Sequence, residues 1–183
     1  MNRQQVLDRL RGFEGCVSYL YRCTGGEVTI GIGHALADAA AAAQLAWVIA
    51  ERPALPGEVQ ADYAKVAAAP KGMLAAKYAP LTQCRLDQDT INQLADADIA
   101  YFESRLAARF PGWNTFPEPA QQALFDMAFN LGTAGLSKFP KMLAAVNAGD
   151  WQTAAAQCER QGISKQRNQA TAALFLQAKS ASA

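Results

Sequence analysis

Three residues near the N-terminus have side chains suited to chemistry, and they surround one short turn. Glu14 follows Phe13 at the end of an apolar stretch, while Cys23 and Thr29 flank the glycine pair at residues 25–26. A carboxyl group partly removed from water holds its proton closer to neutral pH, as a general acid must. The sequence therefore predicts a general acid at Glu14, with Cys23 and Thr29 facing back toward it.

The elements that must position these residues are a helix and a β-hairpin. Apolar residues recur at helical spacing through residues 2–13, so that Glu14 falls in the last turn of a helix. Residues 17–22 and 28–32 predict two strands, joined by a tight turn at residues 24–26. Taken alone, a glutamate at a helix end is typical of an exposed surface residue, and only the combined spacing favours catalysis.

The rest of the chain predicts a mostly helical body. Residues 37–80 are interpreted as an alanine-rich insertion of short helices, one of them continuing from Ala39 through Ile49 until Pro53 breaks it. Residues 81–178 predict a helical lobe, followed by a frayed tail. The fold class is therefore α+β and mostly helical, in a single domain over residues 1–183 with residues 14–34 as its catalytic hairpin. The further helices are expected at residues 58–68, 87–110, 117–131, 140–147, 150–160 and 165–178.

Composition and charge exclude several classes of protein. The 183 residues are 51% apolar and 18% charged, which is typical of a globular chain and not of a disordered one. A net charge of +1 argues against nucleic acid as a partner. Neither an apolar signal core nor a stretch of membrane-spanning length occurs, so we expect no membrane partner.

The four cysteines and the one histidine predict neither a metal site nor a cofactor. They contain no CxxC pair, so a structural zinc site is not expected. Cys16 and Cys23 bracket the first strand, and a disulfide between them would consume the thiol at the turn and act as a redox switch. Two separate thiols are the favoured interpretation.

The spacing of the hairpin residues resembles that of a known enzyme family. The pattern Glu14-x8-Cys23-x5-Thr29, followed by IGIGH at residues 30–34, is similar to phage-type lysozymes, the muramidase endolysins of glycoside hydrolase family 24. The resemblance resumes after the insertion in ALFDMAFNLG, in LAAVNAGDWQTAA and in Arg167-x7-Phe175. The insertion and the KFPK and GDWQTAA segments look most like lysozyme-like domains of bacterial antagonistic toxins.

The resemblance implies a lysozyme-like fold, with a small β lobe, a larger helical lobe and a cleft between them. It also implies roles for individual residues. Glu14 would be the general acid, Thr29 would hold the attacking water, and Cys23 stands where the family usually has an aspartate. Arg167 matches the arginine that pairs with the catalytic glutamate, and Asn130 matches a residue that binds an N-acetyl sugar. His34 matches a position with a structural hydrogen bond or ion pair, outside the catalytic set.

Two of these assignments have alternatives that the sequence leaves open. Asn130 is also typical of a structural asparagine at the C-terminal end of a helix, just before Gly132. A neutral thiol at Cys23 is a poor substitute for a carboxylate, since a free cysteine has a pKa of about 8.5. Some endolysins of the family nevertheless carry cysteine here. Glu27 lies on the same hairpin, but its spacing does not match the family position.

The function predicted from this resemblance is hydrolysis of the β-1,4 bond between N-acetylmuramic acid and N-acetylglucosamine in peptidoglycan. A lytic transglycosylase, which needs only the single acid Glu14, and a non-catalytic peptidoglycan-binding module are the alternatives. The expected partner is peptidoglycan, with an immunity protein if the chain is a toxin, and the expected state is a monomer. Action in the periplasm or cell wall without a signal peptide would require delivery by a holin or a secretion system.

Overall fold

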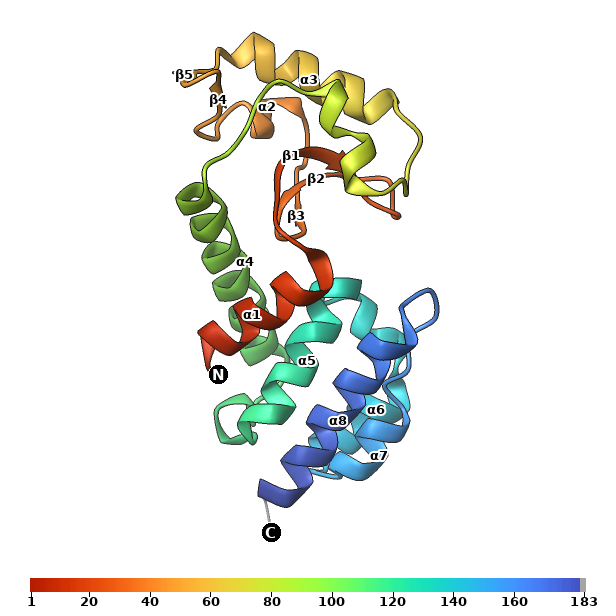
Figure 1. Ribbon diagram of the computed structural model, residues 1–183. Coiled ribbons are helices and arrows are strands. Elements are labelled where there is room, and N and C mark those ends of the chain that lie inside the picture. The colour runs from red at the N-terminus through yellow and green to blue at the C-terminus, as the bar shows by residue number, and fades with distance from the viewer. Residues whose placement is uncertain (182–183) are drawn as a thin grey trace. The chain divides into compact units, whose positions relative to one another are not determined.

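A computed structural model describes residues 1–181 of the chain (Figure 1). The chain forms two compact units, one comprising Leu7–Asp98 and the other comprising Met1–Val6 with the residues from Ile99 onward. We call them the hairpin unit and the helical unit. Helices α1 (Arg3–Glu14) and α4 (Gln88–Arg109) contribute residues to both units. The predicted α+β, mostly helical, lysozyme-like fold is confirmed.

The hairpin unit contains a three-stranded antiparallel sheet in the order β1-β2-β3. Its strands are β1 (Val17–Arg22), β2 (Val28–Gly31) and β3 (His34–Ala35), and every residue of β2 is buried. The register pairs Tyr21 with Thr29. Gly31 has φ +67°, and a Cβ atom there would lie 3.2 Å from Cγ2 of Ile91, so the central strand has no room for a side chain at this position.

Helix α1 ends at Glu14 for a local reason. Gly15 has φ +75°, and its N–H donates to the Arg11 carbonyl at 3.0 Å, which is a glycine C-terminal cap. Arg11 Nη2 also donates to Asn92 Oδ1 at 2.7 Å, which ties the end of this helix to α4 within the hairpin unit. The position of Glu14 therefore follows from the cap and from this side-chain anchor.

The predicted helix from Ala39 through Ile49 is wrong. Helix α2 covers only Ala39–Ala42, and β4 (Val48–Ile49) then pairs with β5 (Arg52–Pro53) in a small hairpin. Val48 also exchanges two backbone hydrogen bonds of 2.9 Å with Arg85, which lies far along the chain. Val48 and Ile49 are β-branched, and such residues favour strands. The long-range pairing therefore favours a strand here over the end of a helix.

The remainder of the insertion is helical, as predicted. It consists of α3 (Pro56–Ala68) and the short 3₁₀ helices η1 (Ala75–Lys77) and η2 (Ala79–Leu81). Asp62 of α3 is buried and accepts the backbone N–H groups of Gln83 at 2.6 Å and Cys84 at 2.9 Å. Burial alone would raise the pKa of Asp62, but these N–H groups hold it below its usual value.

The Asp62 contacts lead to a stability prediction. Asp62→Ala should lower the free energy of unfolding by about 2–3 kcal/mol, because two backbone N–H groups lose a charged acceptor. Asp38→Ala is the matched control, since it removes an exposed cap of α2 whose carboxylate accepts the Ala41 N–H at 2.8 Å. It should cost about 1 kcal/mol or less. Urea unfolding followed by circular dichroism measures both, and equal costs would contradict the prediction.

The helical unit is built around α5 (Glu118–Leu131). Every residue from Ala120 to Ala128 is buried, which is typical of a helix enclosed on all sides. Helix α8 (Lys165–Ala181) packs against both α5 and α7 (Trp151–Ala156), and α7 packs against α6 (Pro140–Asn147) (Figure 1). The other elements are η3 (Trp113–Thr115) and η4 (Gly135–Lys138).

The helix boundaries of this unit agree with the predicted ones except at the ends of α7 and α8. That helix was expected over residues 150–160, with Asp150 as its cap; Asp150 does cap it, but it ends at Ala156. The frayed tail was expected over residues 180–183. Helix α8 continues through Ala181, and residues 182–183 lie outside the described residues. Among residues 1–181, no helix has both the length and the apolar character needed to cross a membrane.

Candidate active site

The turn between β1 and β2 covers residues 23–27 and is fixed at both ends. The Gly26 N–H donates to the Cys23 carbonyl at 3.1 Å, and the Cys23 N–H donates to the Glu27 carbonyl at 3.0 Å. Gly26 has φ +109°, a conformation that favours glycine. Arg22 braces the loop, because its Nε and Nη1 donate to the carbonyls of Gly26 and Ala69, each at 2.8 Å. The side chains on this loop are therefore held on a defined backbone.

This loop brings Cys23 and Glu27 into direct contact. The Cys23 thiol donates to Glu27 Oε2 at 2.9 Å. That bond, with the backbone N–H of Glu27 and, more weakly, the charge of Lys71, holds the pKa of Glu27 below its usual value. Because the thiol is the donor, it carries its proton in this arrangement. The sequence spacing alone gave Glu27 little weight, whereas the structure makes it the hydrogen-bond partner of Cys23.

Thr29 lies on β2 opposite Tyr21 and is 3% exposed. Its hydroxyl donates to the Glu27 carbonyl at 3.2 Å. Thr29 thus serves its strand and also fixes the backbone next to the Cys23–Glu27 contact. This structural role does not conflict with the role in holding water that the resemblance implies.

Glu14 and the hairpin residues share one electrostatic environment. Burial, then the negative charge of Glu14, then Cys23, raise the pKa of the Tyr21 phenol. Both Glu14 and Cys23 therefore lie near Tyr21. Glu14 itself is half-buried at the end of α1. The hairpin unit thus contains all three predicted catalytic residues, Glu14, Cys23 and Thr29, and their roles stay predictions.

His34 makes the structural contact expected for it. Its Nδ1 lies 2.9 Å from Asp98 Oδ2, which joins β3 to α4 inside the hairpin unit. The four cysteines are free thiols in this structure, with Cys16 exposed and Cys84 buried, and the interpretation of Cys16 and Cys23 as separate thiols stays a prediction. Among residues 1–181, no cluster of three or more His, Cys, Asp or Glu side chains could hold a metal ion.

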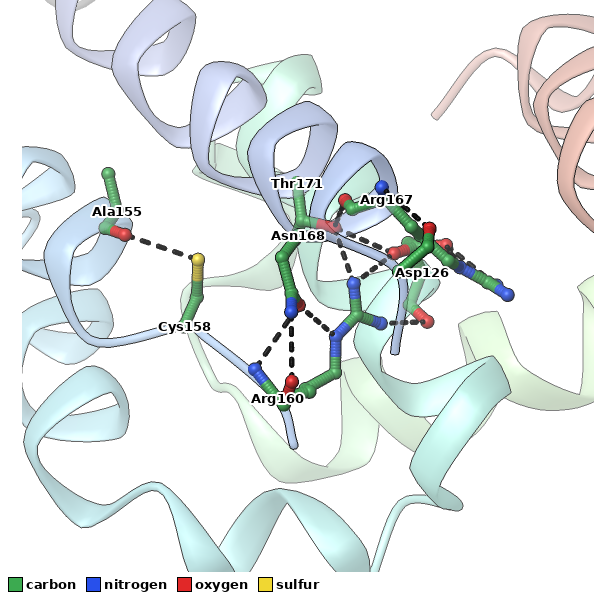
Figure 2. Close-up of polar contacts among 8 residues, drawn as sticks. Asp126, Ala155, Cys158, Arg160, Arg167, Asn168 and Thr171 are labelled. Carbon is green, nitrogen blue, oxygen red and sulfur yellow. Dashed lines mark hydrogen bonds and ion pairs between the residues drawn. The ribbon is translucent and has the colours of Figure 1, made fainter. Parts of the chain in front are cut away.

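Arg167 belongs to the helical unit and takes part in a buried polar cluster that the sequence did not predict. Its Nε donates to Asp126 Oδ1 at 2.9 Å, while Arg160 Nη2 and the Thr171 hydroxyl contact Asp126 Oδ2 at 2.8 and 2.7 Å. Figure 2 shows how both guanidinium groups converge on Asp126. Asn168 completes the cluster. Its side-chain oxygen Oδ1 accepts hydrogen bonds from the backbone N–H and the Nε–H of Arg160, each at 3.2 Å.

Asp126 is the centre of this cluster and is 2% exposed. Burial alone would raise the pKa of Asp126, but the charges of Arg167 and Arg160 hold it below its usual value. The sequence did contain a signal: an aspartate inside the apolar run ALFDMAFNLG must be buried and must find cationic partners. Which cations it would find cannot be read from the sequence.

Asn130 lies near the C-terminal end of α5, before Gly132. Its side-chain oxygen is buried, and among residues 1–181 it has no hydrogen-bond partner. A buried acceptor of this kind costs free energy unless a ligand or water satisfies it. The predicted role of Asn130 in binding an N-acetyl sugar stays a prediction.

The helical unit also has a hollow of about 670 Å³, lined by residues 159–163, Lys165 and Asn168. It lies beside the N-terminus of α8, and none of the predicted catalytic residues lines it.

Comparison with known proteins identifies the family of the chain. The family model for phage lysozyme matches residues 11–176, a range that includes Glu14, the hairpin, Asp126 and Arg167. A stretch of 44 residues is 46% identical to the pre-baseplate central spike protein Gp5 of Enterobacteria phage T4. That stretch is 24% of this chain and 8% of Gp5, so the match covers a small part of the relative. On the extent of the family match, the chain belongs to the phage lysozyme family.

Proposed function

We propose that the protein is a muramidase that hydrolyses the β-1,4 bond between N-acetylmuramic acid and N-acetylglucosamine in peptidoglycan. Family membership implies the coarser statement, that it is a lytic enzyme acting on peptidoglycan. The observation that supports the finer one is the environment of Tyr21, whose pKa the charge of Glu14 raises and which pairs with Thr29 across the sheet. An acid and a water-binding hydroxyl at one place are what glycoside hydrolysis requires.

In this proposal, Glu14 protonates the leaving oxygen of the glycosidic bond. A water molecule attacks the sugar carbon from the opposite face, so the configuration of that carbon is inverted. The side chains of Cys23 and Thr29 assist this water. The Thr29 hydroxyl donates to the Glu27 carbonyl, but its oxygen keeps lone pairs that can accept from that water. The family resemblance also assigns substrate binding to Asn130, whose side-chain oxygen is unsatisfied, and to Arg167, and both assignments stay predictions.

Mass spectrometry of muropeptides tests the proposal. Digestion of purified peptidoglycan should release soluble fragments that end in reducing N-acetylmuramic acid. Fragments with 1,6-anhydro ends would instead identify a lytic transglycosylase. Binding to insoluble peptidoglycan without release of fragments would identify a binding module, and either result would overturn the muramidase assignment.

We further propose that the protein acts as a monomer in the periplasm or the cell wall, after delivery by a holin or a secretion system. A holin gene beside its own would support the first route, and a gene for an immunity protein would support the second. Sedimentation velocity at micromolar concentration measures the oligomeric state, and a dimer would contradict this part of the proposal.

A further inference from the structure

The proposed reaction needs a group that takes a proton from the attacking water, and Cys23 is poorly suited to that task. Its thiol carries a proton and donates it in a hydrogen bond. A protonated thiol has neither the negative charge nor the basicity for this step. The acceptor of its hydrogen bond, Glu27, has both.

We infer that the Glu27 carboxylate is the base that activates the attacking water, and that Cys23 is a positioning residue for it. The inference rests on the proposed function, since it assigns one group in that reaction. It goes beyond the spacing of the hairpin, which places Cys23 and not Glu27 at the family position for a carboxylate.

The first support is the space that the loop leaves for this carboxylate. Glu27 folds back over Gly25, where a Cβ atom would collide with Glu27 Oε2. The φ angle of Gly25 is not in the left-handed region, so its backbone does not itself require glycine. A side chain at residue 25 would therefore displace the Glu27 carboxylate from the position in which it contacts the thiol.

The second support is the fixed backbone of Glu27. Its carbonyl accepts from the Cys23 N–H at 3.0 Å and from the Thr29 hydroxyl at 3.2 Å. Arg22 holds the loop against Ala69 at the end of α3. A catalytic group held by such contacts is already oriented before substrate binds.

The third support is the ionisation of Glu27. Because the Cys23 hydrogen bond and, more weakly, Lys71 lower the pKa of Glu27, this residue is a carboxylate at neutral pH. It is exposed to solvent, so a water molecule can reach it. Its role is to accept a proton and to offer negative charge to the sugar carbon as positive charge develops there.

The step balances without any further reactant. The water oxygen forms a bond to the sugar carbon while the bond to the leaving oxygen breaks, and Glu14 gives its proton to that leaving oxygen. The water proton passes to Glu27. Exchange with solvent then returns a proton to Glu14 and removes one from Glu27, and the Cys23 thiol keeps its proton throughout.

Glu27→Gln is the first test. It should slow the release of reducing ends from purified peptidoglycan by about 100-fold or more, because a glutamine accepts no proton. Binding to insoluble peptidoglycan and the melting temperature should stay as in the wild type, because the side chain is exposed. Glu51→Gln, at an exposed glutamate of the same unit outside the site, is the matched control and should leave the rate unchanged.

The double variant Cys23→Asp with Glu27→Gln separates chemistry from structure. It places the carboxylate at residue 23 in place of residue 27, its hydrogen-bond partner. The double variant should therefore recover most of the rate that Glu27→Gln loses. Gly25→Ala should also slow the reaction, since it displaces the Glu27 carboxylate while leaving both partners intact. Cys23→Ser keeps a donor and should be faster than Cys23→Ala.

Loss in Glu27→Gln with recovery in the double variant supports the inference. A Glu27→Gln rate within about threefold of the wild type would overturn it, since removing a base costs about 100-fold or more. Loss without recovery would also overturn it, because a purely structural role would then explain the loss. A wild-type protein that releases no reducing ends would overturn the proposed function and this inference with it.

Discussion

Glu14→Gln is expected to slow peptidoglycan hydrolysis by about 10³-fold, which is within the range for loss of a general acid. The leaving oxygen of the glycosidic bond must take up a proton as the bond breaks, and a glutamine amide has none to give. The substitution keeps the shape of the side chain at the end of α1, so the fold and the binding to peptidoglycan should persist. Release of reducing ends, measured beside a pull-down on insoluble peptidoglycan, separates the two properties.

Asp8→Asn is the control for this experiment. Asp8 lies on the same helix and is exposed, and its carboxylate is 3.6 Å from Arg11 Nη1, which is a weak surface contact. We expect its rate to stay within about twofold of the wild type, since surface pairs of this kind are worth little. If Glu14→Gln continued to clear purified cell walls, the general acid would have to be another residue.

The parts of the fold that the sequence predicted are those with local causes. The end of α1 at Glu14 follows from the cap at Gly15, and the hairpin turn follows from the glycine at residue 26. The helix predicted through Ile49 failed because Val48 pairs with Arg85, a contact between residues far apart in the chain. Local patterns carry no information about such a partner.

The candidate site also contains residues that the sequence predicted and one that only the structure identified. The spacing of Glu14, Cys23 and Thr29 identified the hairpin, but it gave no reason to prefer Glu27. The contact of Glu27 with Cys23 depends on the conformation of the loop at residues 23–27 and on the space over Gly25, which only the structure shows. Arg167 and Asn130 came from the family resemblance, and their pairing with the hairpin residues stays a prediction.

Removal of the buried carboxylate at Asp126 should have the largest effect on stability. Asp126→Leu is expected to lower the free energy of unfolding by about 3–5 kcal/mol, because it leaves the fully buried guanidinium of Arg160 without its ion-pair partner. It also removes the carboxylate that holds Arg167 at 2.9 Å. Urea unfolding at pH 7, followed by circular dichroism, measures the loss.

The double variant Asp126→Leu with Arg160→Met is the matched control. A buried ion pair replaced by apolar side chains of similar size is often neutral, whereas the loss of one partner is not, so the double variant should recover part of the lost stability. No recovery would mean that Asp126 acts mainly through Arg167 and Thr171, both of which it also contacts.

The pH dependence distinguishes loss of the Asp126 charge from loss of packing alone. The pKa of Asp126 in the folded protein is below its ordinary value of 3.8, so the stability that its charge contributes is fully present above that value. It is lost as the pH falls through the lower, folded value. The stability difference between the wild type and Asp126→Leu should therefore shrink as the pH is lowered from 7 through the region below 3.8. A difference that stayed constant on acidification would show that packing, and not the carboxylate charge, makes α5 the centre of the helical unit.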